Sequence, residues 1–156
     1  MFSEDISLKK LDLHNFYTES VAEIHFMFSK CTSLEELNID NFNTSKIKYF
    51  AGLFLGCKSL KKIDLSSFDT SNGTEFGGYY QWANVSGCVY SNCGMFSGCS
   101  SLTEIDLSNF DTSNAIYMGR MFEGCSNLVN VNLSSFDTSN VTSIGGMFSG
   151  CKSLNS

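Results

Sequence analysis

The chain has 156 residues, of which 42% are hydrophobic and 13% aromatic, and its formal net charge is −6 at pH 7. This composition excludes a disordered chain and predicts one folded domain over residues 1–156 with a continuous core. The acidic balance argues against nucleic acid and anionic membranes as partners, because affinity for phosphate comes from clustered Lys and Arg. No apolar run approaches the ~20 residues of a membrane helix, so we expect no membrane insertion.

An apolar-polar-apolar triplet recurs along the chain and defines an internal repeat. The triplets begin at Leu11, Leu37, Ile63, Ile105 and Val131. Three of the four steps are 26 residues long, and the step from Ile63 to Ile105 is 42, so this turn contains a 16-residue insertion. Periods of 20 to 29 residues are typical of leucine-rich-repeat solenoids. The alternation predicts that the triplets pair side by side as strands of one parallel sheet.

A phenylalanine follows each triplet, where leucine-rich repeats usually carry Asn or Cys. The phenylalanines at this position are Phe16, Phe42, Phe68, Phe110 and Phe136. The sequence predicts that their rings stack into a spine.

The second half of each turn has a different period. In the last turn Val141, Ile144, Phe148 and Cys151 fall on one face of a helix, and the same spacing occurs over 21–31 and 47–57. The D-T-S phrase before each segment, as at 137–139, supplies helix N-caps. Glycines stand where a C-terminal cap is expected, at Gly56, Gly98, Gly124 and Gly150. The prediction is an α/β leucine-rich-repeat solenoid of about six 26-residue strand-plus-short-helix turns.

Both termini enter the repeat in mid-turn. Leu154-Asn155-Ser156 shows no polar cap, although an open solenoid end exposes core and strand edges. We therefore expect a fragment of a longer array, or end-to-end self-association. The stretch from Met1 to Lys10 lacks the layout of a signal peptide.

One long phrase carries a family resemblance. M-F-x-G-C-x-S-L-x-x-I-D-L-S-x-F-D-T-S runs from Met95 and starts again at Met121. It resembles the repeat of BspA-like leucine-rich surface proteins of bacteria, over nearly the whole chain except the insertion. The resemblance implies a cell-surface or secreted location and adhesion to a protein partner. It carries over no catalytic residues.

Stacked turns would place equivalent polar residues in columns on the exposed, concave face of the sheet. The candidate binding residues there are Asp12, His14, Glu36, Asn38, Asp40, Asp64, Ser66, Asp106, Ser108 and Asn132. They predict an acidic, hydroxyl-rich groove for a basic or sugar-like partner. The alternative is purely structural, because Lys10, Glu36, Lys62 and Glu104 alternate in sign and would neutralise one another across strands.

The insertion, at about residues 74–94, is rich in aromatic residues. It contributes four further candidates, Tyr79, Tyr80, Trp82 and Tyr90. Such residues on a rigid scaffold often carry recognition, and a carbohydrate-binding function rests on them; alternatively they cover the flank of the repeat. Gly73 takes a core valine position, so we expect the helix of this turn to be broken or displaced.

Cysteine usage indicates structure more than chemistry. Five cysteines share one repeat position, at Cys31, Cys57, Cys99, Cys125 and Cys151, and are interpreted as buried apolar groups. Cys88 and Cys93 form a disulfide if the compartment is oxidising. No loop resembles a calcium site, no cofactor motif is present, and His14 and His25 are the only histidines. We expect a non-enzymatic protein-interaction module, with a self-assembling structural repeat as the alternative.

Overall fold

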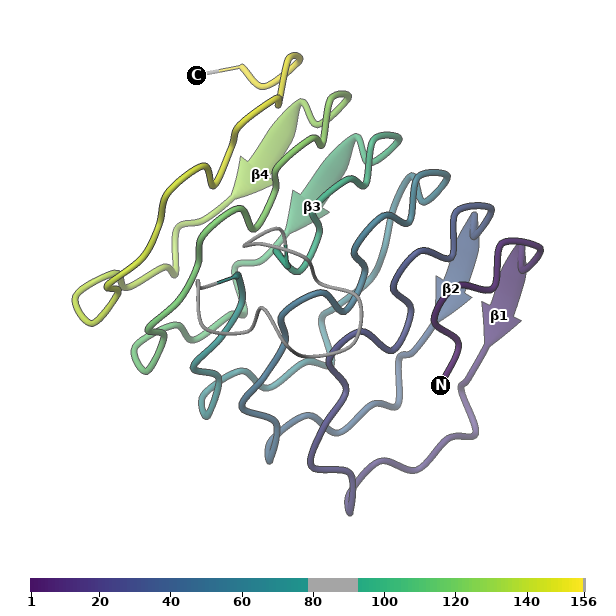
Figure 1. Ribbon diagram of the computed structural model, residues 1–156. Helices are drawn as coiled ribbons and strands as arrows, with labels where there is room; N and C mark the ends of the chain where they lie inside the picture. The colour runs from purple at the N-terminus through teal and green to yellow at the C-terminus, as the bar shows by residue number, and fades with distance from the viewer. Residues whose placement is uncertain (79–92, 156) are drawn as a thin grey trace.

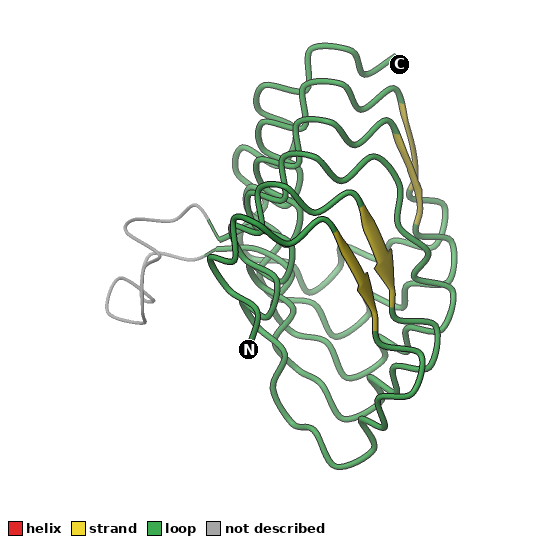
Figure 2. Cartoon of the chain, turned by 90° about the vertical axis from the view of Figure 1, so that its right-hand side faces the viewer, coloured by secondary structure: helices red, strands yellow, loops and turns green. Residues whose placement is uncertain are grey.

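The computed structural model describes residues 1–78 and 93–155, and in it successive turns of the chain lie side by side (Figure 1). The described strands are β1 (Lys10–Asp12), β2 (Glu36–Asn38), β3 (Glu104–Asp106) and β4 (Asn130–Asn132). They follow one side of the stack, and most of the remaining chain consists of turns and loops (Figure 2). The molecule is therefore a repeat protein with short strands.

Strand pairing follows the repeat register. β1 pairs parallel with β2, with Leu11 opposite Leu37, and β3 pairs parallel with β4, with Ile105 opposite Val131. The predicted parallel pairing at repeat spacing is confirmed.

The predicted single sheet is wrong for the described residues, which form two separate two-stranded sheets. Residues 62–64 of the third turn are not a strand. A strand of three residues is held by only a few hydrogen bonds to its neighbour. If one or two of these bonds are missing, the segment is no longer a strand. Before β3, the third and fourth turns are joined by the Thr103 N–H, which donates to the Lys61 carbonyl at 3.2 Å.

The predicted short helices are also wrong, since no helix occurs among the residues described. In the first turn, the N–H groups of Met27, Ser29 and Cys31 donate to carbonyls three residues back, at 3.0 to 3.2 Å. The intervening N–H of Phe28 donates to Leu53 of the next turn at 3.0 Å. An α-helix needs every N–H to bond four residues back within its own segment. Here alternate N–H groups instead join neighbouring turns.

The glycines predicted as helix C-caps do adopt left-handed backbone, with φ of +71° at Gly56 and +76° at Gly98. They close tight turns and not helices. Lys30 occupies the same position of the first turn with φ +59°. The conformation therefore belongs to the repeat position, and glycine is the residue that adopts it without steric cost.

A phenylalanine stack exists, but it is not the one predicted. It consists of Phe2, Phe28, Phe54, Phe96, Phe122 and Phe148, with neighbouring centroids 5.4 to 5.8 Å apart and planes within 15°. Their backbone N–H groups join consecutive turns, so the rings inherit the spacing of the turns. Of the predicted set, Phe42, Phe68 and Phe110 are buried, whereas Phe16 is 43% exposed. Phe68 and Phe110 lie against Phe50 and Phe76, which are outside this stack.

The D-T-S phrases connect turns and do not cap helices. In the second turn's phrase, Thr44 is buried, and its Oγ1 donates to the Asp69 carbonyl at 2.8 Å and accepts the Asp69 N–H at 2.9 Å. Asp69 in turn accepts the N–H and Oγ–H of Ser71 at 3.0 and 2.6 Å. The same residue types thus serve a local turn and a link between turns.

The cysteine column is buried, as predicted, except that Cys151 is half-buried. Each Sγ donates to the carbonyl of a phenylalanine in the preceding turn; Cys57, for example, bonds Phe28 at 3.1 Å. The thiols therefore pack as small groups and also link turns.

The insertion leaves the repeat after Gly77 and rejoins it at Gly94. The Met95 N–H donates to the Phe76 carbonyl at 2.9 Å, just as Leu53 bonds Phe50 in the second turn. The turn thus closes as if residues 78–93 were absent. Gly77 and Gly94 pack so tightly on the next turn that an added Cβ at Gly94 would lie 1.9 Å from the Arg120 carbonyl oxygen.

The predicted break at Gly73 does not occur. Its N–H donates to Thr70 at 2.7 Å, as Ile47 bonds Thr44 in the second turn. The Phe76 ring fills the space of the missing side chain, since a Cβ on Gly73 would lie 2.6 Å from Phe76 Cζ.

Over the described residues, no helix is long and apolar enough to cross a membrane.

Candidate binding face

Two ion pairs cross the strand side of the molecule. Lys10 Nζ contacts Glu36 Oε1 at 2.6 Å, and Lys62 pairs with Glu104 in the same column. All four side chains are more than half exposed, so each pair contributes little to stability. The lysines of this face are therefore neutralised by their neighbours, as the structural alternative predicted.

The aspartate and asparagine column closes the bend after each strand. Each side chain accepts a backbone N–H two residues later, at 2.9 to 3.2 Å, in Asp12, Asn38, Asp64, Asp106 and Asn132. The backbone N–H groups of Ser66 and Ser108 hold the pKa values of Asp64 and Asp106 below the usual range. Both carboxylates stay ionised at neutral pH and face solvent.

The third column begins with a histidine-aspartate pair. His14 Nδ1 lies 2.8 Å from Asp40 Oδ1, and this hydrogen bond raises the pKa of His14. Asn41 Nδ2 donates to the His14 carbonyl at 2.6 Å. Ser66 and Ser108 continue the column as exposed hydroxyls.

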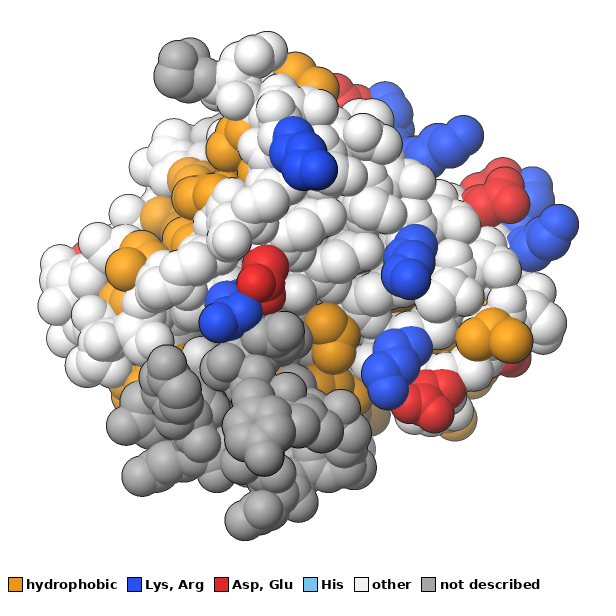
Figure 3. Space-filling view, turned by 45° about the horizontal axis from the view of Figure 1, so that its top comes forward, with side chains coloured by type: hydrophobic (Ala, Val, Ile, Leu, Met, Phe, Trp, Pro, Cys, Tyr) orange, Lys and Arg blue, Asp and Glu red, His pale blue; other side chains and the backbone are white. Residues whose placement is uncertain are grey.

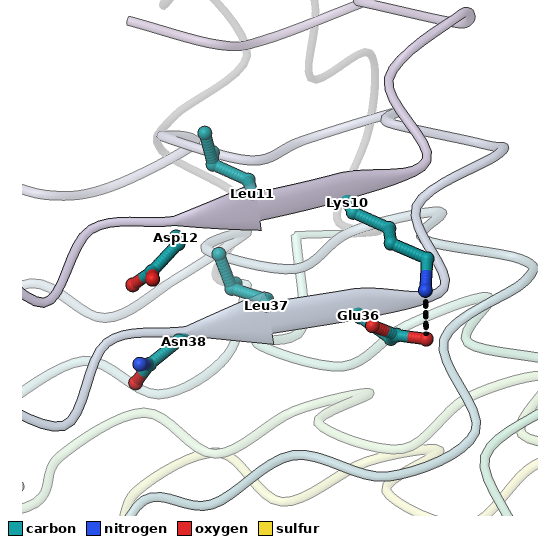
Figure 4. Close-up of a pocket in the computed structure, with 6 residues that line it drawn as sticks. All are labelled: Lys10, Leu11, Asp12, Glu36, Leu37 and Asn38. Atoms are coloured by element: carbon teal, nitrogen blue, oxygen red, sulfur yellow. Dashed lines mark hydrogen bonds and ion pairs between the residues drawn. The ribbon is translucent and has the colours of Figure 1, made fainter.

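A shallow depression of about 470 Å³ lies over β1 and β2. Its lining residues are Lys10, Leu11, Asp12, Glu36, Leu37 and Asn38 (Figure 4). Leu11 and Leu37 point one way from the strands, and Asp12 and Asn38 the other (Figure 4).

Of the predicted site residues, the depression gathers Asp12, Glu36 and Asn38. The other described candidates, His14, Asp40, Asp64, Ser66, Asp106, Ser108 and Asn132, are outside its lining. The depression is also lined by Leu11 and Leu37, which the repeat pattern assigned to the core. Both are partly buried and pack against the core, as that assignment predicted.

The family assignment rests on a match that spans the chain. A family model described as "Mycoplasma protein of unknown function, DUF285" matches residues 1–85 and 81–156. The chain belongs to the DUF285 family. Two DUF285 matches in succession agree with a repeat protein. Neither the curated proteins nor the solved structures contain a significant match to the chain.

The buried cysteines of the column in this DUF285 chain have thiols of low reactivity. Burial raises the pKa of Cys57 and of Cys125 to about 12, and it also raises the pKa of Cys99, so their thiolates are scarce at neutral pH. Among residues 1–78 and 93–155, no group of three His, Cys, Asp or Glu side chains is placed to hold a metal ion.

The aromatic candidates Tyr79, Tyr80, Trp82 and Tyr90 lie outside the described residues, as does Cys88. Cys93, at the end of the insertion, is buried and disulfide-bonded.

Charge is scattered over the face shown in Figure 3, where several Lys and Arg side chains stand beside a carboxylate. Arg120 and Glu123 form an ion pair, with their Nη1 and Oε1 atoms 2.7 Å apart. This pairing limits the positive charge available to an anionic ligand.

Proposed function

We propose that this DUF285 chain is a leucine-rich-repeat-type solenoid of a bacterial cell-surface protein that binds a protein partner through its strand side. The observation that carries the proposal is the depression over β1 and β2, where Asp12, Glu36 and Asn38 present polar groups and Asp12 and Asn38 point to the same side of the strands (Figure 4). Charged and hydrogen-bonding side chains gathered on one exposed surface can contact a protein partner of complementary charge. The resemblance to BspA-like surface proteins supports the same function.

The charges of this face indicate the chemistry of the partner. Lys10 and Lys62 are neutralised by glutamates, whereas Asp64 and Asp106 are ionised and form no ion pair with any described residue. The face therefore has net negative charge, and a basic partner surface complements it. Nucleic acid, membrane insertion, a cofactor and catalysis form no part of the proposal.

A surface or secreted location fits the cysteine chemistry. Cys93 is disulfide-bonded, and disulfides persist mainly in oxidising compartments outside the cytosol. The five column cysteines are free thiols, and burial protects four of them from the same oxidant.

Site-directed photocrosslinking tests the proposal. In one variant a photoreactive residue replaces Asp12 of β1. In the matched control it replaces Asn140, which is exposed and lies outside the strands. Each chain is incubated with biotin-labelled host-cell surface proteins and irradiated. We expect a discrete crosslinked protein from position 12, weakened by salt, and none from position 140. Equal crosslinking at both positions, or none at either, would contradict the proposal.

A deletion of residues 78–93 separates the strand side from the insertion. If the crosslink at position 12 persists in the deleted chain, the strand side carries the contact. If capture of the same protein is lost, the contact lies on the insertion and the proposal fails for the strand side.

A further inference from the structure

Three asparagines occupy the same position in successive turns and make the same contact. Asn72, Asn114 and Asn140 each donate Nδ2 to the carbonyl of a serine in the preceding turn, at 2.7 to 2.8 Å. The N–H of the following residue in each case donates to the threonine carbonyl of the same turn, at 2.7 to 3.0 Å. The three sites therefore share one geometry.

The residue after the asparagine differs among the three sites. It is Gly73 after Asn72, alanine after Asn114 and valine after Asn140, and Asn72-Gly73 is the only Asn-Gly pair in the sequence. The backbone nitrogen of a following residue can attack the asparagine Cγ. A C–N bond then forms, ammonia leaves, and a cyclic imide results. Water opens either imide carbonyl to give aspartate or isoaspartate. Glycine has no Cβ to hinder this attack, so Asn72 is chemically the most susceptible of the three.

The fold opposes this reaction at both reacting atoms. The Gly73 N–H is engaged by the Thr70 carbonyl at 2.7 Å, and the Asn72 amide is held by the Ser45 carbonyl at 2.8 Å. The Phe76 ring also packs against Gly73, with Cζ 2.6 Å from the position of an added Cβ. Cyclisation requires both hydrogen bonds to break and the Asn72 side chain to rotate, which needs local opening of the turn.

We propose that Asn72-Gly73 is a latent modification site, which hydrolyses to aspartate or isoaspartate only when the third turn opens away from the second. The product carries a carboxylate that cannot donate to the Ser45 carbonyl. The reaction therefore removes one link between these turns and marks molecules that have opened.

The proposal is tested by measuring how fast isoaspartate forms at Asn72. The protein is incubated at mildly alkaline pH, and isoaspartate is detected by peptide mapping. The full chain is incubated in native buffer and in urea above its unfolding midpoint, and a peptide covering residues 68–77 gives the intrinsic rate in both solvents. Each rate is divided by that of the peptide in the same solvent. We then expect the conversion of Asn72 in the native chain to be at least about tenfold slower than in the unfolded chain, which corresponds to about 1.4 kcal/mol of opening free energy. Asn114 and Asn140 should convert more slowly than Asn72 in the unfolded chain.

The matched control is the double variant Gly73→Ala/Phe76→Met, which copies the Ala115 and Met118 pair of the fourth turn and avoids the clash of alanine with Phe76. It should fold, as judged by circular dichroism, and lose the fast conversion in urea. Equal native and unfolded rates at Asn72 would overturn the proposal. So would conversion of Asn114 or Asn140 as fast as Asn72 in urea.

Discussion

At the scale of single residues, the buried threonines are polar side chains whose loss should destabilise the fold. Thr44 is 1% exposed, and its hydroxyl both donates to and accepts from the backbone of Asp69 in the next turn. Thr44→Val removes both bonds and leaves the Asp69 N–H without its acceptor. We expect the free energy of unfolding to fall by about 1–3 kcal/mol in urea titrations. Thr142→Val, on an exposed residue, is the control, and an equal loss in both variants would contradict this role.

The cysteine column predicts a graded thiol reactivity. Cys57, Cys99 and Cys125 are buried with strongly raised pKa values, whereas Cys151 is half-buried and its pKa is raised less. In the native chain, iodoacetamide should modify Cys151 first and the other three only after unfolding, as read by mass spectrometry of digests. Modification of native Cys99 at its unfolded rate would show that the column is not buried.

The His14-Asp40 pair predicts a local pH response. The hydrogen bond between His14 and Asp40 raises the pKa of His14 above the ordinary value of about 6.5. The contribution of the pair to stability is therefore fully present below the unfolded pKa and is lost as pH rises through the folded pKa. Both side chains are half exposed, so the change in stability is small. In NMR titrations Asp40→Asn should lower the His14 pKa; an unchanged value would exclude the pair.

Sequence reasoning identified the important positions at this scale better than their roles. The aspartate column and the buried cysteines were found from the repeat alone. The D-T-S residues were assigned to helix caps, because Asp, Thr and Ser serve helix N-termini and isolated turns with the same hydrogen bonds. Only the position of the neighbouring turn shows that Thr44 bonds Asp69.

At the scale of elements, the error in the helices has a physical origin. Apolar residues at 21, 24, 28 and 31 recur at helical spacing, but consecutive tight turns place the same residues inward. Hydrophobic periodicity records which side chains face the core and not which carbonyl each N–H reaches. Bonds between turns, such as that from Phe28 to Leu53, therefore lie beyond what periodicity can predict.

The insertion should be separable from the repeat. Because Phe76 and Met95 close their turn directly, deletion of residues 78–93 restores a 26-residue turn. We expect the deleted chain to keep its circular dichroism spectrum and a Tm close to that of the full chain. Gly94→Ala in the full chain should instead lower Tm sharply, because the new Cβ meets the Arg120 carbonyl. A deleted chain that fails to fold would show that the insertion is part of the scaffold.

At the scale of the whole molecule, the 26-residue period predicted the main organisation correctly. Parallel pairing, the inward-facing leucines and the cysteine column all follow from the repeat spacing. The identity of the phenylalanine stack did not, since Phe42 and Phe54 are equally apolar and equally periodic in the sequence. Which rings stack depends on which backbone segment bonds directly to its neighbour.

The central claim is that, in the second half of each turn, alternate backbone N–H groups bond to the next turn and the segment does not form an α-helix. Scalar couplings across hydrogen bonds, measured by NMR on labelled protein, test it most directly at Phe122. We predict a coupling between the Phe122 nitrogen and the Met147 carbonyl carbon, whose oxygen accepts this N–H at 2.9 Å. A coupling to the Met118 carbonyl, four residues back as in an α-helix, would contradict the account.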